Sequence, residues 1–169
     1  RNSIPGWTAA GEGASKPLTV RQLLSHTGGV NVSGFDGYLL GQPVPTLEQI
    51  LNGKPPANNS AIRIDRAPGT QFRYSGGGYT LLQALIAERA GEDFGELMQR
   101  LVLKPLGMRD SSFARGQEGA TNDSALGHDK TAKASSGGCR IYPELAAAGL
   151  WSTPADLATF AIALMRSAP

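Results

Sequence analysis

The stretch "QFRYSGGGYTLL", residues 71–82, joins a turn-like segment to a helical pattern. Ser75 is a residue type that begins helices, because its side-chain oxygen accepts a backbone N–H group of the first turn. Leucines then follow at helical spacing, and Gly91 is a typical helix end. The first turn nevertheless holds three glycines, each costing roughly 1 kcal/mol relative to alanine inside a helix. Glycines at such a position allow another backbone or a substrate to approach closely.

Tyr74 stands directly before this predicted helix. A tyrosine serves as a general base only where its surroundings stabilise the phenolate, as a lysine ammonium group within a few Å does. The positive end of a helix acts in the same direction, more weakly. The alternative is a half-buried tyrosine that precedes a turn and has no chemical role. The spacing by itself leaves both interpretations open.

Four further helices are predicted from their start and stop signals. Two begin with capping boxes, one at Thr19 and one at Thr46. A third begins at Asp93 and ends before Pro105. The fourth begins at Thr153, with proline at the first helical position. Its apolar residues are expected to face the core, namely Leu157, Phe160, Ala161 and Leu164.

Signals for strands are few. Residues 62–64 and 139–142 alternate between apolar and polar types and are each expected to join a small hairpin or edge ribbon. The segments 30–45 and 114–138 are long, rich in glycine and polar residues, and expected to be loops. The sequence therefore predicts one domain over residues 1–169, mainly α with long loops and minor β.

Composition argues against several classes of function. Sixteen basic and fourteen acidic residues leave a net charge of +2 without a basic stripe, so no nucleic-acid partner is expected. No apolar stretch approaches the roughly 18 residues of a membrane span. One cysteine, Cys139, rules out an internal disulfide. His26 and His128 lack metal-ligand spacing, so neither a metal nor a cofactor is expected.

The chain begins without methionine or an apparent signal peptide, and we expect a mature product or a piece of a longer protein. It contains no Gly-x-Ser-x-Gly elbow and no Ser-x-x-Lys pair. The three glycines do not complete a dinucleotide-binding fingerprint, because Leu81 stands where the last glycine belongs.

Four blocks, in order, resemble the serine β-lactamase-related hydrolases. They are "LTVRQLLSHTGGV" (18–30), "PGTQFRYSGGGYTLLQALI" (68–86), "LVLKPLGMRDSSF" (101–113) and "AAAGLWSTPADLATFA" (146–161). That group includes class C β-lactamases, D-Ala-D-Ala carboxypeptidases, D-aminopeptidases and β-lactamase-like esterases.

The resemblance implies acyl transfer or hydrolysis of an ester, amide or β-lactam through an acyl-enzyme. In the family, a Ser-x-x-Lys motif supplies the nucleophile, a Tyr-x-Asn motif supplies the base, and a third motif lines the pocket from a strand. Tyr74 matches the base, while Ser75 and Gly76 complete that motif and are expected to contact substrate. Gly76 replaces the usual asparagine, which weakens a β-lactam or peptide assignment and leaves esters and amides open.

The first and third motifs are absent, so the resemblance implies a truncation. Residues 1–169 would be the helical lobe of the β-lactamase/transpeptidase-like α+β fold, whose partner is the missing α/β lobe. The substrate would be a small molecule or peptide-like, and the compartment periplasmic or extracellular. His26 and Trp151 are expected to have structural roles, Trp151 in the core, and a second catalytic phenol at Tyr79 is not expected.

Two alternatives stay open. One is a non-catalytic homologue that acts as a binding or scaffold domain. The other is an independent helical interaction domain. Residues upstream of Arg1 would distinguish the enzyme from the scaffold, because only the enzyme needs a Ser-x-x-Lys pair there.

Overall fold

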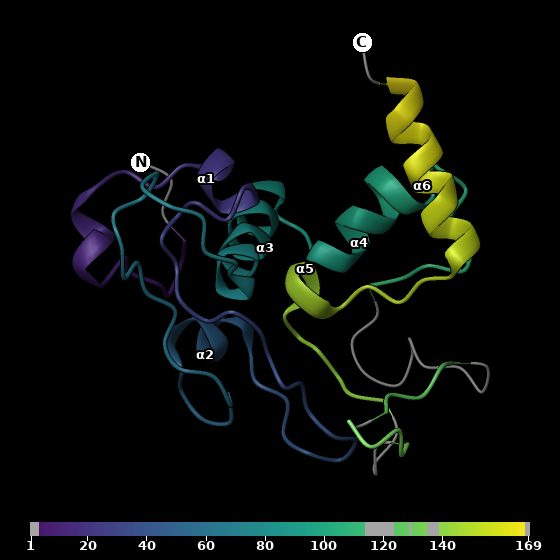
Figure 1. The fold of residues 1–169 in the computed structure, drawn as a ribbon, viewed down its shortest axis with the longest axis horizontal. Helices are drawn as coiled ribbons and strands as arrows, with labels where there is room; N and C mark the ends of the chain where they lie inside the picture. Colours follow the sequence, from purple (N-terminus) through teal and green to yellow (C-terminus); the bar gives the residue numbers. More distant parts are fainter. Residues whose placement is uncertain (1–3, 114–123, 129, 135–138, 168–169) are drawn as a thin grey trace.

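The computed structural model describes residues 4–113, 124–128, 130–134 and 139–167. These residues form helices joined by long irregular segments, with no strand among them (Figure 1). The α-helices are α1 (Val20–Leu24), α2 (Leu47–Asn52), α3 (Gly76–Ala90), α4 (Phe94–Met98), α5 (Leu145–Ala148) and α6 (Pro154–Ser167). A 3-10 helix, η1 (Glu12–Ser15), precedes α1, and a π-helix, η2 (Gln99–Leu103), continues α4.

The fold is built around α3. Helices α1, α2, α4 and α5 all pack against it, and its first half is buried on nearly every side. A cluster of buried apolar side chains from α1, α2, α3 and the segments between them forms the core: Leu23, Val30, Ile50, Leu51, Ile62, Leu81, Leu82 and Ala84. In this arrangement, α1 and the loop that follows it come together at the N-terminal end of α3.

The predicted caps are confirmed. Thr19 and Thr46 each accept the backbone N–H of the glutamine three residues on, and that glutamine bonds back to the cap, so both capping boxes are complete. Ser75 accepts the N–H of Gly78 at the start of α3. These bonds satisfy donors that a helix start otherwise leaves unpaired.

Two predicted helices are shorter than the apolar pattern suggested. Helix α1 ends at Leu24, because His26 adopts a left-handed φ of 55° that stops helical propagation. After Asp93, regular α-helix lasts only to Met98 and then widens into η2. Apolar spacing is preserved through such changes, so the sequence pattern could not reveal them.

The two strand predictions are wrong for the described residues. Residues 62–64 contribute one isolated bridge, between Ile64 and Val30, and no strand. Their backbone donors use different partners: Ile62 donates to Leu51 O and Ile64 to Ala10 O. No ladder can form when successive residues bond to unrelated segments. The second predicted strand contributes one isolated bridge, in which Ile141 exchanges backbone hydrogen bonds with Tyr38.

Helix α5 was not predicted from the sequence. It is attached to α3 by the buried side chain of Gln83, whose Nε2 donates to Pro143 O while its Oε1 accepts from Ala146 N. An amide that serves both a donor and an acceptor of another segment orients that segment as well as holding it.

The prediction that α6 faces the core is also wrong. Leu157 is 48% exposed, Phe160 37% and Leu164 55%, and Ala161 is exposed as well. No described helix packs against α6, which extends away from α3 (Figure 1). The apolar spacing thus identified a face that nothing in the described part of the chain covers.

Helix α6 is attached through its first turn. The buried carboxylate of Asp156 accepts the N–H of Asp110 at 2.9 Å and the hydroxyl of Ser111 at 2.7 Å. Trp151, predicted to lie in the core, is half-buried and forms a backbone bridge with Ser112 next to this turn. None of the described helices is both long and apolar enough to cross a bilayer.

Candidate functional site

The first turn of α3 is covered by the backbone of residues 31–33. The N–H of Gly76 donates to Ser33 O at 3.2 Å, and the N–H of Gly77 donates to Val32 O at 2.9 Å. The hydroxyl of Ser75 donates to Asn31 O at 2.8 Å. The unpaired donors of the helix start therefore find their acceptors in a neighbouring loop.

This close contact explains the glycine at position 77. A Cβ atom at position 77 would lie 2.7 Å from Asn31 O, closer than a carbon and an oxygen can approach. One at position 76 would lie 3.1 Å from the ring of Phe35. At Gly78, by contrast, the nearest atom would be 3.5 Å away, an ordinary contact. The sequence prediction of a close backbone approach is confirmed at Gly77.

The loop carries backbone strain at the same place. Val32 has a φ of 58°, a left-handed value that a β-branched side chain rarely adopts. Its carbonyl is one of those that accept from α3. Strain of this kind persists only where the surrounding structure holds it, and it gathers at functional sites.

Tyr74 lies immediately outside this buried junction. Its side chain is 58% exposed, whereas Ser75 is 3% exposed. The Tyr74 ring lies against the imidazole of His26, with ring centroids 4.4 Å apart and planes inclined at 34°. Among the described residues, none hydrogen-bonds the Tyr74 hydroxyl, so the phenol is open to a further group.

Ser75 and Gly76 are buried and are engaged in contacts within the protein. The Ser75 hydroxyl donates to Asn31 O and accepts from Gly78 N, which leaves little of it to meet a substrate. Gly76 is buried beneath Phe35 and has no polar side chain to offer. Both residues hold the start of α3, and their contact with substrate stays a prediction.

His26 does what the sequence predicted, because it bonds to nearby backbone. Its Nδ1 accepts the N–H of Ser75 at 3.1 Å. The same ring lies 5.1 Å from the ring of Tyr79 and meets Phe72 edge-on at 5.8 Å. The hydroxyl of Tyr79 donates to Leu24 O at 3.2 Å. Tyr79 is therefore held by α1, unlike Tyr74.

Glu144 is a titratable group that sequence reasoning missed. It is fully buried at the start of α5, and neither carboxylate oxygen has a hydrogen-bond partner among the described residues. Burial raises the pKa of this carboxyl from 4.5 to about 7. Burial also raises the pKa of the Tyr38 phenol, with a smaller contribution from Glu144. No local sequence signal marks a buried glutamate.

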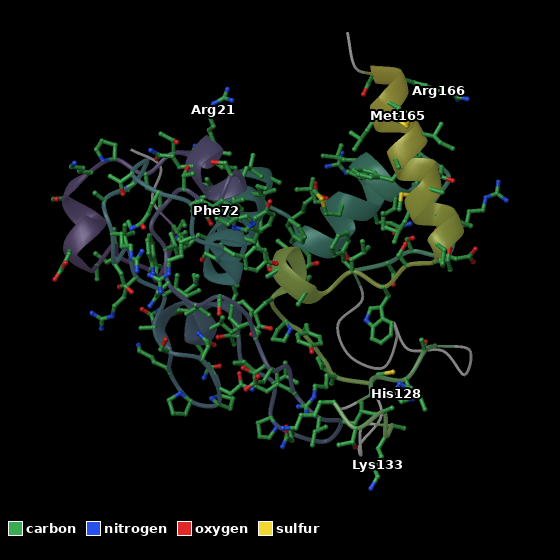
Figure 2. The ribbon with its side chains drawn as sticks, in the orientation of Figure 1. Arg21, Phe72, His128, Lys133, Met165 and Arg166 are labelled. Atoms are coloured by element: carbon green, nitrogen blue, oxygen red, sulfur yellow. The ribbon has the colours of Figure 1, made fainter. Side chains whose placement is uncertain are left out.

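Apart from the start of α3, two other kinds of site come into question among the described residues, a metal site and a surface groove. Among the described residues, no group of three or more His, Cys, Asp or Glu side chains could hold a metal ion. A groove of about 590 Å³ lies between α2, α3 and the N-terminal segment, with Glu48 and Glu88 on its walls. It is not lined by Tyr74, Ser75 or Gly76. Figure 2 shows the side chains around α1 and α3, with Phe72 near the start of α3.

The model of the family described as Beta-lactamase matches residues 4–169. Over 101 residues, the chain is 28% identical to the "Putative penicillin-binding protein PbpX" of Bacillus subtilis, a match over 60% of this chain and 23% of that protein.

Two solved structures share the fold over nearly the whole chain. The octameric penicillin-binding protein homologue from Pyrococcus abyssi matches with a TM-score of 0.69 and 26% identity, over 98% of this chain and 38% of that one. A D-stereospecific amidohydrolase from Streptomyces sp. matches with a TM-score of 0.71 and 23% identity, over 98% of this chain and 52% of that one. The chain thus spans about half or less of the length of these proteins.

Proposed function

The chain belongs to the Beta-lactamase family, and on that premise we propose that it forms the helical lobe of a serine hydrolase in which Tyr74 is the general base. The observation that carries the proposal is the contrast at the start of α3. The Ser75 hydroxyl and the N–H groups of Gly76 and Gly77 are all hydrogen-bonded, while the adjacent phenol of Tyr74 is exposed and has no described hydrogen-bond partner. The buried start of α3 thus presents the Tyr74 phenol outward.

The proposed reaction has two steps. In the first, Tyr74 takes the proton of a serine hydroxyl as the serine oxygen forms a bond to the substrate carbonyl carbon. The carbonyl–leaving group bond then breaks, and the leaving oxygen or nitrogen receives the proton from Tyr74. In the second step water gives a proton to Tyr74 as its oxygen adds to the acyl carbon. The bond from that carbon to the serine oxygen then breaks, the serine oxygen takes the proton back, and the acid is released. The sequence holds no Ser-x-x-Lys pair, so this nucleophile belongs to chain beyond these 169 residues.

The exposed face of α6 is consistent with a missing lobe. Its apolar residues follow helical spacing yet meet no described helix, and contiguous apolar surface of this kind marks an interface. We propose that an α/β lobe, supplied by the rest of the protein, covers it. The domain of residues 1–169 would then be part of a larger domain.

The proposed substrate is an ester or an amide. Gly76 offers no side-chain amide to a substrate, and its backbone N–H is already bonded to Ser33 O. A β-lactam or D-amino peptide would need another donor in its place. The fold likeness to an amidohydrolase agrees with the amide class.

The test is turnover by the longer hydrolase that carries this chain. A p-nitrophenyl ester, a D-amino acid amide and a chromogenic β-lactam are compared for the wild type, Tyr74→Phe and Tyr79→Phe. Loss of a general base typically costs a factor of about 10² to 10⁴, so Tyr74→Phe should lose that much on its best substrate. Tyr79→Phe, which removes the neighbouring phenol, should stay near wild type. Equal activity in all three proteins would refute the proposed role.

A non-catalytic homologue is the second candidate, and the absence of a Ser-x-x-Lys pair from the sequence is the observation that favours it. A fluorophosphonate probe distinguishes the two. The longer protein should be labelled on one serine if it is an enzyme and should stay unlabelled if it is a scaffold.

A further inference from the structure

His26 occupies a turn that is fixed on both sides. Its N–H donates to Leu23 O at the end of α1, and its carbonyl accepts the N–H of Arg73 at 2.7 Å. Its φ of 55° places the side chain between α1 and the segment that leads into α3. The backbone of His26 thus joins the end of one helix to the residue before Tyr74.

The hydrogen bond to Ser75 defines the state of the imidazole. Nδ1 accepts the Ser75 N–H, so Nδ1 carries a lone pair and the ring proton lies on Nε2. This bond is possible only for the neutral ring. In the imidazolium form, an N–H on Nδ1 would face the N–H of Ser75, and two donors would oppose each other.

The imidazole is also the one described side chain that contacts the Tyr74 ring in a stacked geometry. The rings of Tyr74 and Tyr79 are each inclined at 34° to it, and the centroid distance is shorter for Tyr74. Tyr79 has a second attachment through its hydroxyl, whereas Tyr74 has none among the described residues. His26 is the one described aromatic side chain in ring contact with Tyr74, and it is therefore placed to orient that exposed ring.

We propose that His26 is the positioning residue for Tyr74. Its neutral imidazole fixes the tyrosine ring by stacking and fixes the start of α3 by accepting the Ser75 N–H. Loss of the imidazole would remove both contacts at once. The catalytic consequence rests on the proposed function, but the structural coupling of His26, Ser75 and Tyr74 does not.

Few charged or titratable groups surround His26. Arg73 lines the small space beside it, and the Arg73 guanidinium lies 3.8 Å from the carboxylate of Asp65. The phenol rings of Tyr74 and Tyr79 lie against the imidazole.

The coupling is tested by NMR on this chain, labelled with ¹⁵N and with ¹³C in its tyrosine rings. A scalar coupling across the hydrogen bond should join the Ser75 amide to the ring nitrogen Nδ1 of His26, and through-space contacts should join the Tyr74 ring to the His26 ring. His128, the other histidine and an exposed one, is the internal control, because its ring should show neither signal. Absence of both signals at His26 would overturn the proposal.

Two substitutions separate the hydrogen bond from the stacking. His26→Asn keeps a side-chain acceptor and suits a left-handed φ, so the Ser75 amide signal should keep its wild-type position. The ring-current shift on Tyr74 should be lost, because asparagine has no aromatic ring. His26→Phe keeps an aromatic face and removes the acceptor, so the Ser75 signal should move. If both variants leave Ser75 and Tyr74 at their wild-type positions, His26 positions neither residue.

In the longer hydrolase, both variants should lower kcat, by about tenfold to a hundredfold, since misplacement by about 1 Å can cost a factor of about 10². If the proposed function is wrong, Tyr74→Phe will be fully active while the His26 variants still change the Ser75 and Tyr74 signals. If the positioning proposal is wrong, the His26 variants will leave those signals as in wild type while Tyr74→Phe is inactive.

Discussion

The backbone of Gly77 lies so close to the carbonyl oxygen of Asn31 that a Cβ atom at position 77 would come within 2.7 Å of it. Asn31 is itself fixed, because its side chain bonds to Ala61 O and to the N–H of Arg63. The loop cannot move away from α3 without breaking those two hydrogen bonds. The glycine in the first turn of α3 is thus required by a neighbouring backbone.

This contact predicts opposite outcomes for two similar substitutions. Gly77→Ala should destabilise the chain by roughly 1–3 kcal/mol, since overpacking of a rigid contact outweighs the helix propensity of alanine. Gly78→Ala should stabilise it by about 0.5–1 kcal/mol, because its Cβ meets only an ordinary contact at 3.5 Å. Urea unfolding of both variants measures the difference. Equal stability of the two variants would mean that the loop of residues 31–33 moves to make room for the Cβ atom.

Glu144 predicts a dependence of stability on pH. The folded-state pKa, about 7, lies above the ordinary value of 4.5, so the folded chain holds this proton more tightly than the unfolded chain. The contribution of Glu144 to the free energy of unfolding is therefore fully present below about pH 4.5, and it falls as pH rises towards 7. This pKa shift corresponds to about 3 kcal/mol of unfolding free energy.

Glu144→Gln supplies the control for this effect. It keeps the shape of the side chain and cannot titrate, so its stability should lack this component between pH 4.5 and 7.5. Unfolding free energies of both proteins across that range test the prediction. A parallel pH profile in the two proteins would exclude Glu144 as the source.

Asp156 predicts how α6 is held. Asp156→Ala removes the acceptor of the Asp110 N–H and of the Ser111 hydroxyl. The Ser111 hydroxyl keeps the Ser152 hydroxyl as a partner, so only the Asp110 N–H is left unpaired. The expected cost is roughly 1–3 kcal/mol for that unsatisfied donor. Asp156→Asn retains one acceptor oxygen and should fall between alanine and wild type. Hydrogen exchange along α6 locates the effect, which should be absent from α2.

The uncovered face of α6 predicts self-association of the isolated chain. Sedimentation should show concentration-dependent oligomers, and replacing Leu157 and Leu164 together by lysine should shift the chain towards monomer. Thr159→Lys adds a charge on the same helix without removing an apolar side chain and serves as the control. A wild-type chain that stays monomeric at every concentration would contradict this interpretation of the face.

Local signals explain what the sequence could predict. Caps such as Thr19, Thr46 and Ser75 are determined by residues within one helical turn, and the structure places all three as expected. The failures have a different origin. The bonds of residues 62–64 depend on three distant segments, and the burial of Glu144 depends on tertiary packing that no nearby residue encodes. The apolar face of α6 meets no described helix, and its own spacing could not reveal that.

For the candidate site, the sequence indicated Tyr74 through family resemblance, and the structure adds its exposure and its contact with His26. The roles of the glycines could only be resolved in three dimensions. Periodicity detects the helix but cannot identify which backbone lies against it. Gly77 and Gly78 are indistinguishable in the sequence and differ by 0.8 Å in the room available to a Cβ atom, 2.7 Å against 3.5 Å.

The central claim is that Tyr74 carries the proton in acylation. The most direct test is the single-turnover rate of acylation of the longer hydrolase, measured by rapid mixing with its best ester substrate. Tyr74→Phe should acylate about 10² to 10⁴ times more slowly than wild type, with Tyr79→Phe unchanged. An acylation rate in Tyr74→Phe equal to that of wild type would contradict the claim.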